Sequence, residues 1–170
     1  AIFIASPNSL HSEHALQAAA AGKHVLSEKP MTTTLEDAVA MVRGCREHGV
    51  KLGTGYHLRT HPGHILTRRL ISEGVLGHVA LAQGQWGFGV RGTGSPPLRT
   101  GLRQWWDDPE LMGGASTMMG TGVHAIDLLR FLLDEEITEI AALTDGQTSE
   151  RPLEQVAAMT LRFAGGAVAT

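Results

Sequence analysis

The sequence predicts an α/β protein, and two observations support this. Short apolar runs alternate with helical segments over about the first 70 residues, which is typical of a parallel sheet with right-handed crossovers. Near residues 74–77 this alternation stops, and a glycine-rich stretch, one long helix and longer strands follow. We therefore expect two structural units, residues 1–77 and residues 78–170.

The first unit is expected to contain strands that alternate with helices. The predicted strands cover residues 2–5, 25–27 and 50–56. An alanine-rich helix over residues 13–21 should end at Gly22, because glycine readily adopts the left-handed conformation that closes a helix. Thr34 is expected to cap the second helix and Gly49 to end it, while Pro62 opens the third.

The second unit is expected to combine strands with one main helix. The predicted strands cover residues 79–86, 139–144 and 156–163, and a further strand starts at residue 167. A glycine- and proline-rich segment over residues 84–101, which contains Pro96 and Pro97, should form a long loop, and such loops are often functional. The apolar pattern of residues 121–133 predicts a helix.

Composition narrows the choice of compartment and partner. The 170 residues are 42% hydrophobic with a net charge of −3, which indicates neither a nucleic-acid partner nor a basic membrane-binding patch. No apolar run approaches the ~20 residues that a membrane span needs. Cys45 is the single cysteine, so no internal disulfide can form, and we expect a cytoplasmic protein. Because the chain opens and stops within strands, we expect an internal piece of a longer protein.

The segment Ser27-Glu28-Lys29-Pro30 is the most informative short stretch. It places a carboxylate and an ammonium side by side at the end of the second strand, and proline directs the exit. In an open α/β sheet, ligands bind in the crevice beyond the carboxyl ends of the strands, so Lys29 can meet a substrate there. A surface ion pair at a turn is the alternative, and spacing alone favours it.

Three blocks of sequence together resemble the glucose–fructose oxidoreductase/inositol dehydrogenase (Gfo/Idh/MocA) family. They are residues 4–11 with 21–31, residues 74–79 and residues 120–132, in the order in which that family has them. The resemblance implies an NAD(P)-dependent oxidoreductase that acts on a sugar, cyclitol or related polyol. It also implies the C-terminal half of a Rossmann domain, followed by part of an α+β domain with an open, mostly antiparallel sheet. Through that sheet the protein should form a homo-oligomer.

The resemblance further implies a binding site for the nicotinamide end of NAD or NADP. Its expected cofactor-binding residues are Ser6, Pro7, Asn8, His11, Glu28, Lys29, Pro30 and Tyr56. Capping of the following helix by Asn8 and Ser9 is compatible with that role. The glycine-rich phosphate-binding turn of the family does not occur in these residues, so we expect this chain alone to bind a dinucleotide poorly.

Alcohol oxidation also needs a base and a group that holds the substrate oxygen. The resemblance assigns these roles to His124 and Lys29. The expected substrate-binding residues are Arg59, Trp105, Thr121 and His124. A capping or core histidine is the alternative for His124, and a solvated loop is the alternative for Arg59. No metal is expected, because the histidines near residue 61 lack the acid of the His-Glu-x-x-His zinc pattern.

The chain departs from the family at Gly120. Many members carry an aspartate four residues before the histidine, and glycine can neither bind the substrate nor tune the base. Thr121, Asp127 or another residue could substitute for it. Two other functions therefore stay open: an NAD-dependent glycosidase on the same scaffold, and a non-catalytic homologue that binds a sugar or cofactor.

Overall fold

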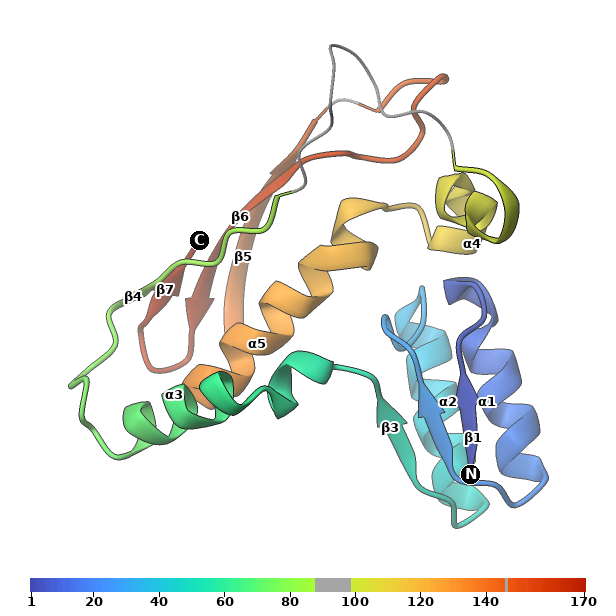
Figure 1. Cartoon of the computed structure of the whole chain (residues 1–170), viewed down its shortest axis with the longest axis horizontal. Coiled ribbons are helices and arrows are strands. Elements are labelled where there is room, and N and C mark those ends of the chain that lie inside the picture. Colours follow the sequence, from blue (N-terminus) through green and yellow to red (C-terminus); the bar gives the residue numbers. More distant parts are fainter. Residues whose placement is uncertain (88–98, 146) are drawn as a thin grey trace.

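The computed structural model describes residues 1–87, 99–145 and 147–170, and these form two sheets with helices packed on them (Figure 1). The first sheet has the order β1-β2-β3 and is parallel throughout, as the alternation of strands and helices predicted. Its strands are β1 (Ile2–Ile4), β2 (Val25–Ser27) and β3 (Leu52–Thr54). The predicted third strand is therefore shorter than expected.

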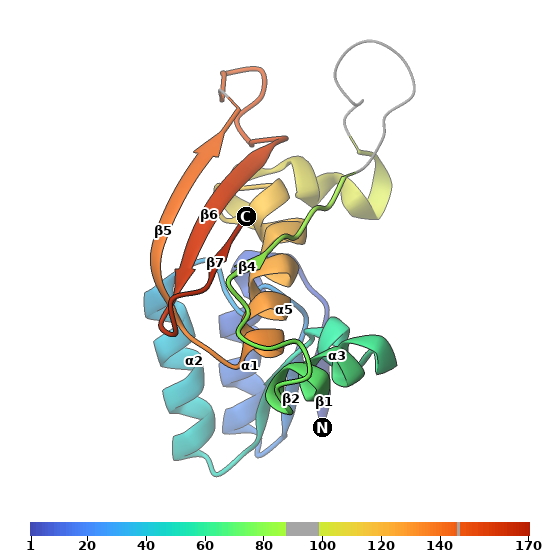
Figure 2. The ribbon, with the colours of Figure 1, turned by 90° about the vertical axis from the view of Figure 1, so that its left-hand side faces the viewer.

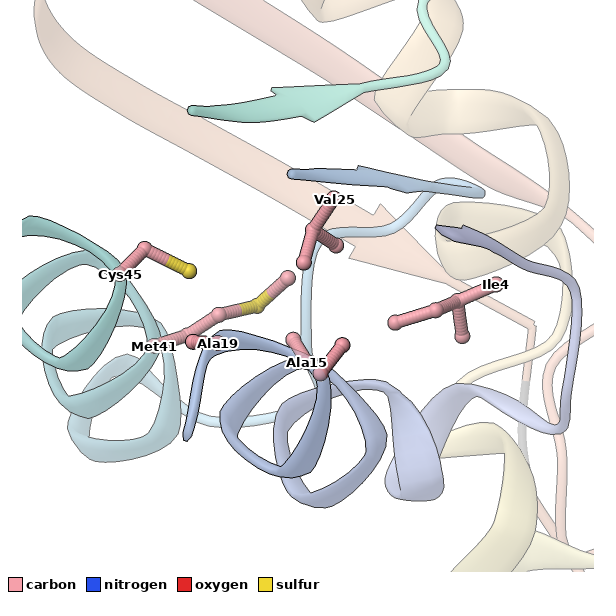
Figure 3. Close-up of a cluster of buried hydrophobic side chains, with 7 residues drawn as sticks. Ile4, Ala15, Ala19, Val25, Met41 and Cys45 are labelled. Carbon is pink, nitrogen blue, oxygen red and sulfur yellow. The ribbon is translucent and has the colours of Figure 1, made fainter. Parts of the chain in front are cut away.

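Two helices cover one face of this sheet, α1 (His11–Ala20) and α2 (Leu35–Glu47). The core between helices and sheet includes Ile4, Val25 and Met41, of which Met41 is fully buried (Figure 3). Thr34 caps α2 as predicted, since its side chain accepts a hydrogen bond from the main-chain N–H of Asp37. A 3₁₀ turn, η1 (Asn8–Leu10), leads directly into α1, which begins two residues earlier than expected.

Beyond β3 the chain leaves the first sheet. It forms the 3₁₀ turn η2 (His57–Thr60) and then α3 (Pro62–Ser72), which Pro62 opens as predicted. The ring of His61 caps α3 by accepting a hydrogen bond from the N–H of Gly63. In Figure 1, α3 lies beside α5 (Val123–Leu133). The division of the chain at residues 77 and 78 stays a prediction.

The second sheet has the order β4-β7-β6-β5, and only the pairing of β4 with β7 is parallel. Its strands are β4 (Leu81–Ala82), β5 (Ile137–Thr144), β6 (Ala157–Phe163) and β7 (Val168–Ala169). Helix α5 covers one face, where Leu129 packs with Leu161 and Phe163 (Figure 2). The expected open, mostly antiparallel sheet is confirmed, although β4 is much shorter than the strand predicted over residues 79–86.

Short helical elements lie between β4 and α5 in the chain. They are the 3₁₀ helix η3 (Gly101–Asp107), the single-turn α4 (Pro109–Met112) and the π-helix η4 (Met118–Gly122), which runs directly into α5. Most of the loop predicted over residues 84–101, including Pro96 and Pro97, lies outside the described residues. Among the helices of the described ranges, none has the length and apolar character that crossing a membrane requires.

Candidate active site

A pocket of about 200 Å³ lies beyond the carboxyl ends of β1 and β2, next to η3. Its lining residues are Ala5, Ser6, Asn8, His11, Glu28, Lys29, Trp105 and Trp106. Most of them were predicted from the sequence as cofactor- or substrate-binding residues. The fold thus brings residues from three separate segments of the chain to one place.

Lys29 links the two units at this pocket. Its Nζ donates a hydrogen bond to the main-chain carbonyl of Gly120 at 2.8 Å, and it lies 5.6 Å from the centre of the Trp106 ring. Burial lowers the pKa of Lys29, while the neighbouring charge of Glu28 acts in the opposite direction. The lysine is therefore held in a partly desolvated position by a carbonyl and an aromatic face.

His11 fixes the two turns that carry the predicted cofactor residues. The ring is fully buried, with Nδ1 2.8 Å from the carbonyl oxygen of Pro30 and Nε2 2.9 Å from that of Ser6. A single imidazole thus joins the turn after β1 to the turn after β2. It therefore holds the carbonyls of Ser6, which precedes Pro7, and of Pro30, which follows Lys29.

Asn8 joins the first turn to the second unit. Its Nδ2 donates to the main-chain oxygen of Met112 at 3.2 Å, and both residues are buried. The structure thus gives Asn8 an inter-unit contact. Its expected contact with a cofactor stays a prediction.

His124 lies at the start of α5 and is 6% exposed. Its ring stacks against Trp86 at 6.0 Å and meets the edges of His57 at 4.9 Å and Tyr56 at 6.2 Å. Burial lowers the pKa of His124, and the charges of Lys29 and His57 lower it further. The Nδ1 atom is buried without a hydrogen-bond partner among the described residues, which at a candidate site indicates a place for a bound group.

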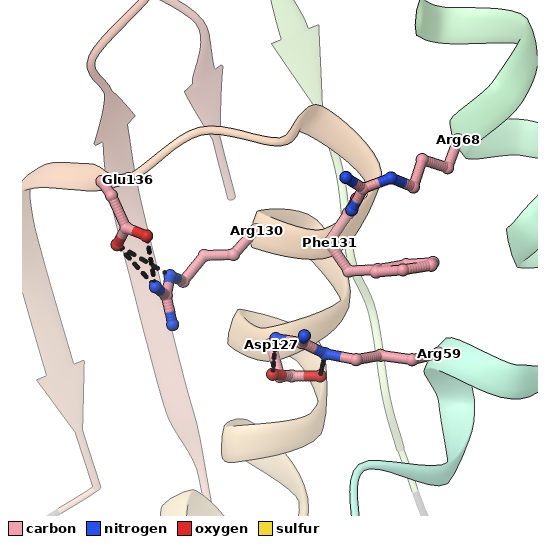
Figure 4. A network of polar contacts seen from close by, with 6 residues as sticks. All are labelled: Arg59, Arg68, Asp127, Arg130, Phe131 and Glu136. Carbon is pink, nitrogen blue, oxygen red and sulfur yellow. Dashed lines mark hydrogen bonds and ion pairs between the residues drawn. The ribbon is translucent and has the colours of Figure 1, made fainter.

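Arg59, expected to contact substrate, pairs with Asp127 in this structure (Figure 4). Its Nε and Nη2 donate to the two carboxylate oxygens at 2.8 and 2.6 Å, and the guanidinium lies 5.6 Å from the Phe131 ring. Asp127 follows His124 by three residues on α5, so its charge opposes the lowering of the His124 pKa. The pair connects η2 to α5 beneath the candidate base.

Gly120 lies beside Trp106. A Cβ atom there would lie 3.2 Å from Cζ3 of Trp106, a tight contact that needs the indole to move by a few tenths of an ångström. Trp105 lies against Trp106 with 5.0 Å between ring centres. Thr121, a predicted substrate residue, donates its hydroxyl to the carbonyl of Thr117 at 2.9 Å within the π-helix.

Two residues at the site escaped prediction. Trp86 stacks on His124, and Glu154 binds the segment before the π-helix. Their partners are distant in sequence, so no local pattern marks them. Within the described ranges, no three histidine, cysteine or acidic side chains gather as metal ligands would.

Two family models together match most of the chain. The model described as the GFO/IDH/MocA C-terminal domain matches residues 64–170, which is more than half of the chain. The model described as the oxidoreductase family, NAD-binding Rossmann fold, matches residues 1–56. Residues 57–63, which include η2 and the first two residues of α3, lie between the two matches.

Curated relatives show the same likeness. Over 170 residues, 99% of this chain, the sequence is 36% identical to 1,5-anhydro-D-fructose reductase of Ensifer adhaerens. It is 35% identical over 80% of this chain to D-xylose 1-dehydrogenase [NADP(+)] of Haloarcula marismortui. The chain spans 48% and 36% of the lengths of these two relatives.

Solved structures agree with this assignment of the fold. The aldose-aldose oxidoreductase of Caulobacter crescentus complexed with glycerol superposes with a TM-score of 0.85 at 33% identity, covering 98% of this chain and 48% of that chain. An inositol dehydrogenase homolog complexed with NAD+ from Azotobacter vinelandii gives a TM-score of 0.88 at 27% identity, covering 98% of this chain and 43% of that chain.

The first prediction concerns the charge next to His124. Lys29→Met removes a positive charge that lowers the His124 pKa, so this pKa should rise. Asp127→Asn removes a charge that raises it, so the pKa should fall. Titration of the histidine Cε1–Hε1 resonances by NMR, assigned with His124→Gln, measures both. Arg43→Met, an exposed change on α2, is the control.

The sign of the effect on stability follows from the same shift. A histidine whose pKa is lowered on folding binds fewer protons when folded than when unfolded. Its contribution to stability is present above the unfolded pKa of about 6.5 and is lost as pH falls through the folded pKa. Equal titration of His124 in wild type and in both variants would contradict the proposed electrostatics.

The second prediction tests the steric pair of Gly120 and Trp106. Overpacking costs about 1–3 kcal/mol, whereas alanine in place of glycine favours a helix by about 1 kcal/mol. We expect Gly120→Ala to be less favourable in the wild type than in Trp106→Ala by at least about 0.5 kcal/mol. Urea unfolding of the four proteins gives this coupling. Gly84→Ala, which meets no atom within 4 Å, should show none.

Proposed function

Because the chain belongs to the GFO/IDH/MocA oxidoreductase family, we propose that the protein transfers hydride between NAD or NADP and a sugar, cyclitol or related polyol. The observation that carries this proposal is the hydrogen bond that brings Lys29 to Gly120, four residues before His124. Lys29 comes from the end of β2 and His124 from the start of α5. The charge of Lys29 lowers the pKa of His124, so the two groups interact electrostatically.

The two side chains have different roles in the proposed reaction. Lys29 holds the reacting oxygen with its ammonium group, which stabilises the negative charge that develops there. His124 takes the hydroxyl proton during oxidation and returns it during reduction. Its lowered pKa keeps the imidazole neutral near pH 7, the form that can accept a proton.

The residues fit the nicotinamide end of the cofactor. When bound, the nicotinamide supplies the hydride acceptor or donor. Ser6, Asn8, Glu28 and Lys29 line the pocket that would hold it, and the unpartnered Nδ1 of His124 lies buried nearby in the candidate site. The diphosphate end needs a glycine-rich turn at a helix N-terminus, which these residues do not contain.

Aromatic side chains shape the substrate side. Trp105 and Trp106 line the pocket, and Trp86 stacks on the candidate base. Aromatic rings offer flat apolar faces with polar edges, a surface suited to the C–H face of a sugar ring. These aromatic side chains offer the hydroxyl groups of a polyol fewer hydrogen-bond partners than carboxylates at the same positions would.

The third prediction tests the reaction itself. The protein, with whatever sequence flanks residues 1 and 170 in its host, should change NAD(P)H absorbance with members of a sugar and cyclitol panel. Lys29→Ala and His124→Ala should each lower kcat by about 10²–10⁴-fold, the range of general acid–base catalysis. Lys51→Ala, at an exposed lysine, serves as the control.

Three outcomes would speak against this function. Absence of cofactor binding would contradict any nicotinamide chemistry. Release of a sugar without net NAD(P)H change would favour the glycosidase alternative. Ligand binding that both alanine variants retain, without turnover, would favour the non-catalytic homologue, which the glycine at position 120 suggests.

We also propose that the outer face of the second sheet binds a second copy of the protein. Helix α5 covers the opposite face, and the outer face is turned toward the viewer in Figure 2. Register places Ala158 opposite Leu143, whose side chain is 80% exposed. An exposed leucine beside an alanine on an uncovered sheet face suits sheet-to-sheet packing.

The fourth prediction tests this face. Leu143→Arg should convert an oligomer into a smaller species, because it places a charge within a buried contact. Sedimentation velocity measures the change. Val39→Arg, at an exposed valine on α2, should leave the assembly as it is. A wild-type protein that sediments as a monomer would contradict the proposal.

A further inference from the structure

Glu154 is a buried carboxylate outside the pocket, with both oxygens in use. It lies in the segment between β5 and β6 and is 2% exposed. Its Oε2 accepts from the N–H of Ser116 and its Oε1 from the N–H of Met118, each at 2.7 Å. Burying a carboxylate is costly unless it is fully hydrogen-bonded, so these two bonds decide whether the carboxylate can lie there.

The two N–H groups lie where the π-helix η4 begins. Ser116 lies two residues before its first residue, Met118, and Thr117 stands between them as the N-cap. At a helix start, main-chain N–H groups lack partners within the helix, and a carboxylate satisfies them well. Thr117 adds a second link, because its hydroxyl donates to the carbonyl of Gln155 at 2.9 Å.

The segment that carries Glu154 is itself fixed to the second sheet. One carboxylate oxygen of Asp145 accepts from the N–H of Gln155 at 2.8 Å and from that of Val156 at 3.0 Å. These bonds lower the pKa of Asp145. Asp145 also donates its own N–H to the carbonyl of Val156 at 3.1 Å. Asp145 directly follows β5, so these three hydrogen bonds fix the segment that carries Glu154 to the end of that strand.

The anchored helix start leads directly to the site. Ser116, held by Glu154, accepts at its carbonyl the N–H of Gly120 at 2.8 Å. Gly120 in turn accepts from Lys29 Nζ at 2.8 Å. The same π-helix continues into α5, which carries His124 near its start. π-helical turns inside helices often occur at functional sites.

We propose that Glu154 is a positioning residue for the candidate active site, holding η4 so that the carbonyl of Gly120 meets Lys29 and His124 enters the site at a fixed position. The proposal rests on the proposed function for its effect on turnover. Its effect on Lys29 does not depend on any reaction. A carboxylate that served stability alone would leave the surroundings of Lys29 unchanged when replaced by a residue of the same shape.

The experiment replaces one acceptor and keeps the shape. In Glu154→Gln the amide oxygen can accept one N–H, but the amide NH₂ faces the other, so one of the two bonds is lost. The chain has three lysines, Lys23, Lys29 and Lys51, so trinitrobenzenesulfonate labelling can be followed for each by peptide mass spectrometry. The exposed Lys23 and Lys51 serve as internal standards.

We expect Lys29 to be labelled several-fold faster in Glu154→Gln relative to these standards. We also expect kcat to fall about tenfold or more with little change in KM, since small misplacements of reacting groups are costly. Glu73→Gln, at an exposed acid after α3 that pairs with Arg69, is the matched control and should change neither value. Unchanged Lys29 labelling in a folded Glu154→Gln overturns the proposal.

If Glu154→Gln does not fold, a second variant tests the positioning role. Thr117→Val keeps the volume and removes the hydroxyl contacts to the carbonyls of Gln155 at 2.9 Å and Glu154 at 3.5 Å, so Lys29 labelling should rise in the same direction by a smaller factor. No rise there overturns the proposal. Faster labelling without turnover of any sugar by the wild type would support the positioning role and overturn only the proposed function.

Discussion

The hydrogen bond from Lys29 Nζ to the carbonyl of Gly120 is the contact on which the candidate site depends. It joins residues 91 positions apart and connects the end of β2 to the π-helix of the second unit. A partly buried ammonium without an acceptor would be costly, so the arrangement of the two units that supplies this carbonyl is favoured. Asn8 and Met112 add a second bond across the same boundary, and His11 shapes the backbone around both turns.

The pKa shifts of Lys29 and His124 follow from the way in which these contacts bury the two side chains. Burial lowers the pKa of both Lys29 and His124, and the lysine charge lowers that of the histidine further. Asp127 acts in the opposite direction, but both its oxygens bind the guanidinium of Arg59, which takes up much of its charge. The arrangement therefore favours a neutral imidazole near a cation. A neutral base and a cation that holds the oxygen are the two groups that alcohol oxidation requires.

Local signals could be predicted from the sequence, and long-range contacts could not. The cap at Thr34, the parallel order of the first sheet and the pocket position of Lys29 follow from spacing within a few residues or from rules for open sheets. The ion pair of Arg59 with Asp127 joins residues 68 positions apart, and the bonds of Glu154 join residues 36 and 38 positions apart. Such contacts form only once the fold is complete, so no local pattern in the sequence predicts them.

The glycine at position 120 changes what the site can do with protons. A main-chain carbonyl can accept a hydrogen bond from Lys29 as a carboxylate would, but it cannot take up a proton near neutral pH. Trp106 lies beside it, so a larger residue there would need the indole to shift by a few tenths of an ångström. The buried carboxylates Asp127 and Glu154 are both bound by protein donors. Proton transfer in the proposed reaction therefore falls to His124, with Lys29 as its electrostatic partner.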